Sequence, residues 1–76
     1  MKEFLEFIAK HLVDHPESVV VESEEKDRKL IFKLRVAEGE IGKVIGRSGK
    51  TASAIRVLLR AVAAKEKKRA VLDIIG

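Results

Sequence analysis

The sequence predicts a single α+β domain, residues 1–76, in which helices cover one face of a three-stranded mixed sheet. Apolar residues recur at helical spacing in two separate segments. Three further segments are β-branched or strictly alternating, as is typical of strands. Two glycines three residues apart stand between a short apolar segment and the second helical one. The predicted order is therefore helix, strand, strand, short helix, long helix, strand.

The first helix is predicted from Lys2 to about Asp14 because its apolar residues recur at helical spacing. Pro16 then biases His15 away from the helical region. Phe7 falls to the side of the apolar face that is expected to cover the sheet. That face consists of Leu5, Ile8 and Leu12.

Two strands are predicted next, over residues 18–23 and 29–36. The first contains three consecutive valines, and in the second apolar residues alternate with mostly charged ones. The charged segment Glu24–Asp27 between them is short, which predicts a hairpin turn and two antiparallel neighbours. The apolar face of the second strand consists of Leu30, Phe32, Leu34 and Val36.

After a loop at residues 37–40, a short helix is predicted from Ile41 to Gly46, with Glu38 or Glu40 near its positive end. A long helix is predicted from Gly49 or Lys50 to about Glu66. A charged connection, residues 65–69, leads to a last strand at residues 71–75. A right-handed crossover makes that strand parallel to the second. The core-facing residues predicted for the long helix are Ala52, Ile55, Leu59 and Val62.

Charge is distributed unevenly along the chain. Residues 1–27 carry 3 basic and 8 acidic side chains, whereas residues 28–76 carry 13 basic and 4 acidic ones, so the net charges are −5 and +9. The basic part contains the glycine pair. Such an asymmetry indicates a polyanionic partner, usually a nucleic acid, although a solvated basic surface is the ordinary alternative.

No apolar segment approaches the roughly 20 residues that a membrane-spanning helix needs, and the acidic N-terminus is unlike a signal peptide. The absence of cysteine agrees with a reducing compartment. We therefore expect a cytoplasmic protein.

The glycine segment has the features of a phosphate cradle. Gly46 and Gly49 flank Arg47 and Ser48, so the chain turns tightly at the start of a long helix, whose dipole favours an anion there, and Lys50 adds charge. It is not a Walker A motif, because the position five residues before Gly49 is Val44 rather than glycine. Lys50 likewise excludes a serine nucleophile elbow.

Catalytic and metal sites are not predicted elsewhere. His11 and His15 lie four residues apart, but Pro16 ends the helix and no cysteine joins them, so surface histidines are expected. No combination of residues supports catalysis. The chain also has no Tyr or Trp, and its three Phe precede residue 33, which disfavours base stacking on an aromatic sheet.

The segment from Ile41 to Ile55, with Ile45-Gly46-Arg47-Ser48-Gly49 at its centre, resembles the IGxxG signature of KH domains. The helix-first order is similar to the type II, bacterial arrangement, and the single small domain resembles the KhpA family of RNA-binding proteins. Ala52 departs from the bulky aliphatic residue that many KH motifs carry three places after the second glycine.

The resemblance implies a groove for about four nucleotides of single-stranded RNA, with the glycine loop at the backbone and apolar residues beneath the bases. Its floor would include Ile41, Val44 or Ile45 and the last strand near residues 71–74, although core packing is the alternative for the three aliphatic residues. No cofactor is implied. The predicted RNA-binding residues are Ile41, Gly42, Lys43, Ile45, Gly46, Arg47, Ser48, Gly49, Lys50, Lys67, Lys68 and Arg69.

The long helix carries a second apolar stripe, formed by Ala54, Val57, Leu58 and Ala61, while Arg56, Arg60 and Lys67 occupy a different, basic side. This stripe favours packing between subunits, most simply in a two-fold homodimer. In the alternative interpretation Leu58 belongs to the edge of the core and the alanines are only good helix formers.

The sequence thus predicts a non-catalytic RNA-binding protein. By the KhpA resemblance it would be an RNA chaperone or post-transcriptional regulator, acting as a homodimer or paired with a larger KhpB/Jag-type KH protein, with links to cell shape. The alternative is a KH-fold interaction module that works mainly through the stripe on the long helix.

Overall fold

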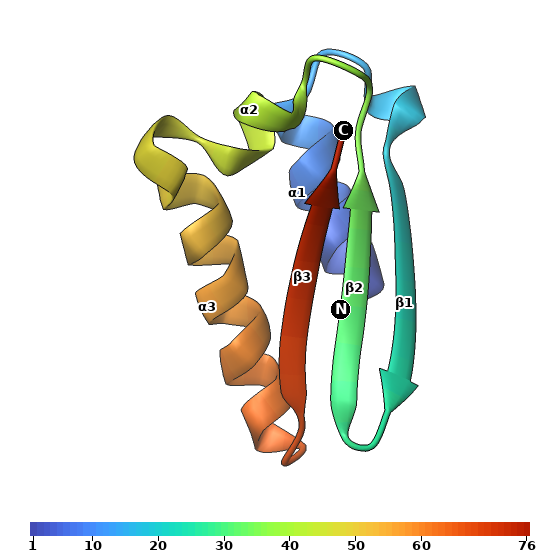
Figure 1. Ribbon diagram of the computed structural model, residues 1–76, viewed down its shortest axis with the longest axis vertical. Coiled ribbons are helices and arrows are strands. Elements are labelled where there is room, and N and C mark those ends of the chain that lie inside the picture. Colours follow the sequence, from blue (N-terminus) through green and yellow to red (C-terminus); the bar gives the residue numbers. More distant parts are fainter.

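The computed structural model describes all 76 residues. Helices and strands follow the predicted order, with two additional single turns of 3₁₀-helix, η1 and η2 (Figure 1). The elements are α1 (Lys2–Leu12), η1 (Pro16–Ser18), β1 (Val20–Lys26), β2 (Lys29–Arg35), α2 (Ile41–Ile45), η2 (Arg47–Gly49), α3 (Lys50–Lys65) and β3 (Arg69–Ile75).

The sheet has the strand order β1-β2-β3. β1 and β2 are antiparallel, with Lys26 opposite Lys29, and β2 and β3 are parallel, with Lys29 opposite Arg69. The mixed sheet and the parallel crossover are therefore confirmed. Figure 1 shows α1 against one face of the sheet, α3 alongside β3, and α2 near the end where β2 and β3 finish. This arrangement places the glycine loop at one end of α3.

Both ends of β1 differ from the prediction. The strand continues through Glu24 and Glu25 to Lys26, and the turn consists only of Asp27 and Arg28, whose φ angles are 51° and 61°. Two left-handed residues make a tight hairpin turn whose twist matches that of the strands. At the other end, η1 occupies Pro16–Ser18, so β1 begins at Val20 rather than Ser18.

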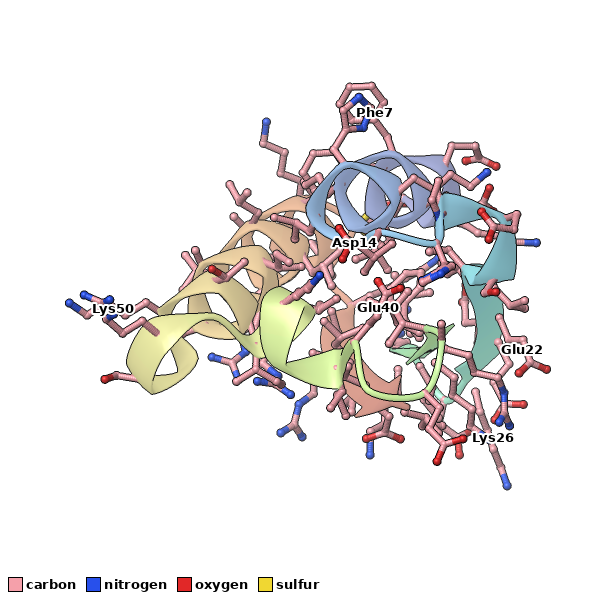
Figure 2. All side chains as sticks on the ribbon, turned by 90° about the horizontal axis from the view of Figure 1, so that it is seen from above. Phe7, Asp14, Glu22, Lys26, Glu40 and Lys50 are labelled. Carbon is pink, nitrogen blue, oxygen red and sulfur yellow. The ribbon has the colours of Figure 1, made fainter.

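The core lies between the helices and the inner face of the sheet. Phe32, Leu34 and Val36 are buried as predicted, and Leu30 is partly buried against them. From α1, Leu5 and Ala9 are buried, whereas Ile8 and Leu12 are only partly buried. Phe7 is 63% exposed and points away from the molecule (Figure 2).

The prediction for α3 is right at Ala52, Ile55 and Leu59 and wrong at Val62. Val62 is 45% exposed, and Ala63 is fully buried in its place. At about 100° per residue, Val62 lies about 65° from the centre of the buried arc. Ala63 lies nearer the centre of that arc, so it faces the core in place of Val62.

The end of α3 is closed by a Schellman motif, in which two backbone N–H groups return to the last turn of the helix. The N–H of Lys67 donates to the Ala64 carbonyl and that of Lys68 to the Ala63 carbonyl, both at 3.0 Å. Lys67 has φ 58°, a conformation in which glycine is usual. Lys67 therefore lies beyond the helix, and not on its basic side as predicted.

Candidate nucleic-acid interface

The loop between α2 and α3 is held in left-handed conformations. Gly46, Ser48 and Gly49 have φ angles of 78°, 55° and 73°. The Gly46 N–H donates to the Gly42 carbonyl at 2.9 Å and the Gly49 N–H to the Gly46 carbonyl at 3.1 Å, which closes two successive turns. The backbone N–H groups of Arg47 and Ser48 have no partner within the chain.

Gly46 is required by its surroundings as well as by its φ angle. A Cβ atom there would lie 2.2 Å from Thr51 Oγ1 and 2.6 Å from Thr51 Cβ, in the first turn of α3. The loop therefore folds tightly back on the helix that follows it. By contrast, a Cβ atom at Gly49 would meet nothing within 4 Å, so only its φ angle favours glycine there.

Two cations flank the free N–H groups. Arg47 and Lys50 are exposed, and Figure 2 shows Lys50 extending into solvent from the start of α3. Neither side chain forms an ion pair. The loop thus combines unpaired backbone donors, the positive end of a 16-residue helix and two uncompensated charges, which together suit an anion such as a phosphate.

The three aliphatic residues of α2 have different environments. Val44 is completely buried and belongs to the core, whereas Ile41 is 37% exposed and Ile45 is partly exposed. Ile41 also contacts the chain beyond β3, because a Cβ atom at Gly76 would lie 2.8 Å from Ile41 Cβ. Gly42 and Lys43 are exposed on the same helix.

Beneath α2, a polar cluster joins this helix to the segment after α1. Glu40 is 5% exposed, and its Oε2 accepts the backbone N–H groups of Asp14 at 2.7 Å and His15 at 3.4 Å. Its Oε1 pairs with His15 Nδ1, and Lys43 Nζ pairs with Asp14. Figure 2 shows Asp14 and Glu40 between α1 and α2.

Each member of this cluster has a shifted pKa. The hydrogen bond and the charge of Glu40 raise the pKa of His15. Burial acts to raise the pKa of Glu40, but the hydrogen bonds from His15 and from the Asp14 backbone hold it below its usual value. The hydrogen bond between Lys43 and Asp14 lowers the Asp14 pKa and raises that of Lys43. Part of the Lys43 charge is therefore compensated within the protein.

A cleft separates α3 from the free edge of β3. It has a volume of about 110 Å³ and adjoins a wider hollow of about 410 Å³ that shares three of its residues. Arg56 Nη2 donates to the Leu72 carbonyl across the cleft at 3.2 Å. The lining residues of the cleft are Arg56, Leu59, Arg60, Ala70, Val71 and Leu72.

The basic connection Lys67–Arg69 lies at the other end of α3 from the glycine loop, about 24 Å away by the length of that helix. Lys68 and Arg69 line the wider hollow. Lys68 Nζ pairs with Glu25 at 2.9 Å, and this hydrogen bond raises the Lys68 pKa. The predicted RNA-binding residues therefore form two groups at opposite ends of α3, and of these residues only Lys68 and Arg69 line the hollows beside β3.

The predicted stripe on α3 faces outward. Val57 and Leu58 are 57% and 49% exposed, and Ala54 and Ala61 are exposed as well. Next to the stripe, an entirely apolar groove of about 340 Å³ runs between α3 and α1, lined by Met1, Phe4, Leu58, Leu59 and Val62. We call the stripe and this groove together the apolar helix face. Leu58 is therefore not part of the core.

Two features of the site were not anticipated from sequence. Glu40 was predicted only as a charge near a helix end, and nothing local indicates that it is buried and pairs with His15, 25 residues away. Arg56 was placed on a basic side but not in the site. The sequence does contain a signal for a basic surface there, because Arg56 and Arg60 lie one turn apart on the flank of α3 opposite Leu58.

The structure contains no cluster of three or more side chains that could hold a metal ion. None of its helices has the length and apolar character needed to cross a membrane.

A helix-first mixed sheet with a glycine loop between two crossover helices defines a KH domain of type II. A family model described as KhpA/KhpB, KH domain, matches residues 2–74. The chain therefore belongs to the KhpA/KhpB KH-domain family. This is a family of RNA-binding proteins and not of enzymes, as predicted.

Curated relatives cover nearly the whole chain. A protein of Clostridium acetobutylicum named RNA-binding protein KhpA is 48% identical over 75 residues, which are 99% of this chain and 100% of the relative. Proteins of the same name from Listeria monocytogenes and Caldanaerobacter subterraneus are 48% and 47% identical over 75 residues, covering 99% of this chain and 99% and 100% of the relatives. No solved structure matches the chain.

Proposed function

We propose that the chain binds single-stranded RNA through a backbone clamp formed by Gly46, Arg47, Ser48 and Gly49. The observation that carries the proposal is the pair of free N–H groups in the left-handed loop, flanked by two unpaired cations. The names of the curated relatives support RNA as the ligand.

The cleft beside α3 provides a path for RNA that is bound at the clamp. RNA held at the loop would run along α3 toward Lys68 and Arg69, with Ile41 and Ile45 near the loop and Val71 at the edge of β3. A path of about 24 Å suits roughly four extended nucleotides. Because few phosphates are contacted, binding is weak and depends on salt, with a slope of about 0.7 per phosphate.

We further propose that the protein acts in the cytoplasm as an RNA chaperone or post-transcriptional regulator. A small domain that contacts RNA mainly through its backbone binds many sequences weakly, which suits both roles. Pairing with a larger KhpB/Jag-type KH protein and a link to cell shape remain proposals that rest on family membership.

The clamp is tested by changing Arg47→Asp together with Ser48→Asp. Fluorescence anisotropy with a labelled single-stranded RNA should show binding weakened about tenfold or more, since a charge-assisted hydrogen bond contributes about 1.5–3 kcal/mol. The control is Ser23→Asp with Lys26→Asp on β1, which alters net charge equally at exposed positions far from the loop.

Circular dichroism verifies that both variants are folded. Unchanged affinity in the clamp variant, or equal losses in the two variants, would contradict the clamp. A preference for DNA over RNA in competition would contradict the proposed ligand.

As a second function we propose association of two copies through the apolar helix face. The supporting observation is that exposed apolar side chains from α1 and α3 adjoin one another: Phe4, Val57, Leu58 and Val62 are each 42–57% exposed. A two-fold dimer would cover them and would place two weak clamps on one particle, which raises avidity.

This interface is tested with Leu58→Asp, which should yield a monomer by light scattering. The control is Phe7→Asp, because Phe7 is also an exposed apolar residue but points away from the molecule. A folded Leu58→Asp variant that stays dimeric excludes this face.

A further inference from the structure

One face of the sheet is not covered by any helix. α1 packs against the opposite face and α3 lies alongside β3, so this open face is the side of the sheet that is turned toward the reader in Figure 1. Alternate residues of each strand point to it, and none of them is buried. The open face is therefore accessible to a partner.

Three cations lie side by side on the open face, at its hairpin end. The strand register places Lys26 opposite Lys29, and Lys29 opposite Arg69, so that each strand contributes one cation. We call these three residues the basic row. All three are exposed, and Figure 2 shows Lys26 extending into solvent on the side of the sheet away from α1. Like charges directly opposite each other in a sheet repel and are destabilising.

Neighbouring acids do not compensate the basic row, because none of its three cations forms an ion pair. Glu25 is adjacent in sequence, but it lies opposite Leu30 on the helix-covered face and pairs with Lys68. Glu24 and Asp27, the other acids nearby in sequence, form no ion pair. The charges of the row therefore repel one another in the free protein and are available to an anion.

The rest of the open face has the opposite arrangement. Lys33 lies between Glu22 and Asp73 in the register, and Arg35 pairs with Glu22 at 3.4 Å. Opposite charges thus lie next to one another on this face everywhere except at the hairpin end. A departure from such a local rule is expected at a functional site, where a ligand of opposite charge removes the repulsion.

The basic row continues the path proposed for RNA. Arg69 lines the wider hollow beside β3 and is also the first member of the row. Its N–H donates to the Arg28 carbonyl at 2.9 Å, which fixes the hairpin turn beside the start of β3. The row crosses two strand spacings, about 10 Å in all. At roughly four nucleotides per 24 Å, this length suits about two further nucleotides.

We propose that single-stranded RNA leaving the cleft turns at Arg69 and crosses the open face of the sheet along the basic row, where Lys29 and Lys26 bind two further phosphates. The proposal rests on the proposed RNA-binding function and extends it to a face of the sheet that includes neither the glycine loop nor the cleft. RNA bound in this way bends around β3, and its site measures about six nucleotides rather than four.

The test compares labelled single-stranded RNAs of four and twelve nucleotides by fluorescence anisotropy. A salt slope of about 0.7 per phosphate makes each contact contribute about fivefold in affinity at about 0.1 M salt, relative to 1 M. Lys26→Gln with Lys29→Gln should therefore weaken binding of the longer RNA about 25-fold at about 0.1 M salt and lower its salt slope by about 1.4. Binding of the shorter RNA should not change.

Lys2→Gln with Lys10→Gln is the matched control, because it removes two exposed lysines of α1 that form no ion pair. It should leave the difference between the two RNA lengths intact. Urea unfolding at low salt gives a second readout. Loss of repulsion in the row should raise the unfolding midpoint of Lys26→Gln with Lys29→Gln, and a lower midpoint would overturn the argument from repulsion.

Two further results would overturn the proposal. One is equal affinity of the wild type for the two RNA lengths. The other is a preference for the longer RNA that the folded variant Lys26→Gln with Lys29→Gln retains in full, since a strand bridging two clamps in a dimer gives such a preference without the basic row.

Failure of the clamp has a different signature. The four-nucleotide RNA does not reach the basic row, so at this length Arg47→Asp with Ser48→Asp should weaken binding, whereas Ser23→Asp with Lys26→Asp should not. If the clamp variant binds the shorter RNA as tightly as wild type, the clamp is wrong, while a row variant that no longer favours the longer RNA would still support the row. If the wild type binds neither RNA, both proposals are overturned.

Discussion

Gly42 and Gly46 lie four residues apart, yet their positions have opposite structural demands. Gly46 has a left-handed φ of 78°, and a Cβ atom there would collide with Thr51, whereas Gly42 lies in α2 with nothing within 4 Å of the position of a Cβ atom. The sequence places Gly46 in the glycine pair of the loop and Gly42 in the short helix before it, but it does not show that only position 46 is too crowded for a side chain.

This difference predicts opposite effects of alanine. Gly46→Ala should destabilise the fold by about 2–4 kcal/mol, combining left-handed strain with overpacking against Thr51. Gly42→Ala should stabilise it by about 0.5–1 kcal/mol, because alanine is a better helix former. Urea unfolding followed by circular dichroism measures both. Equal destabilisation by the two changes would contradict the loop geometry.

At His15, the hydrogen bond and ion pair with Glu40 give the stability of the protein a pH dependence. The His15 pKa is raised above 6.5, so the stabilisation from its pair with Glu40 is complete below that pH and is lost as the pH rises through the raised value. The Glu40 pKa is lowered from 4.5, so its contribution is present above that pH and is lost in more acidic solution. Stability should therefore be greatest between about pH 4.5 and 6.5.

Denaturant unfolding across this range, with His15→Gln as the comparison, tests the pair. The decline above pH 6.5 should be smaller in the variant, because glutamine has no proton to lose. An identical decline in both proteins would assign it to other groups.

At the end of α3, one residue, Lys67, has a strained backbone conformation and also carries a positive charge. Lys67 closes the Schellman motif in a left-handed conformation that glycine would adopt without strain. Lys67→Gly should therefore stabilise the protein by up to about 1 kcal/mol, yet it should weaken RNA binding and lower the salt slope by about 0.7 if Lys67 contacts a phosphate. Thermal unfolding and anisotropy at several salt concentrations separate the two effects. Stronger binding by the variant would exclude that contact.

The elements were largely predictable because their signals are local. Alternation specified the inner face of β2, and helical spacing with Pro16 specified α1. The hairpin turn was misplaced because residues 24–26 are all charged and show no alternation of apolar and polar residues. They are extended because they pair with residues 29–31 of β2. Val62 was misplaced because tertiary packing sets the rotation of α3 about its own axis, and this rotation decides whether position 62 or position 63 faces the core.

The candidate site was predictable only in part, because only some of its features are formed by residues that are contiguous in the sequence. The loop from Gly46 to Gly49 is contiguous, so the sequence displays it, whereas the cleft is formed by α3 and β3 and depends on tertiary packing. Arg56 and Leu72 are 16 residues apart, and their contact requires the complete crossover.

On the scale of the whole molecule, the uneven charge of the sequence becomes a spatial separation. Figure 2 shows Lys50 at one side of the molecule and Glu22 on β1 at the other. β1 carries three glutamates, while the cleft at the opposite edge of the sheet is lined by arginine and lysine. RNA is therefore expected to be attracted by the basic edge and repelled by the acidic edge, which would orient its approach.

Neutralising the acidic edge tests this orientation. Glu22→Gln with Glu24→Gln should raise the association rate with RNA at low salt and have little effect near 1 M salt, where charges are screened beyond about 3 Å. Stopped-flow measurements at both salt concentrations give the association and dissociation rates of each protein. A change of the same size in the dissociation rate instead would place these glutamates close to the bound RNA.

The contact between Arg56 and Leu72 also bears on solubility. An apolar edge strand with unpaired backbone groups is a template for the growth of intermolecular sheets. Residues 70–75 include one charged side chain, Asp73, so sequence alone protects this edge poorly. A cation fixed on its central carbonyl obstructs strand addition when no ligand is present, and RNA lying in the cleft would cover the rest. Occupancy by RNA is therefore expected to keep the protein from aggregating.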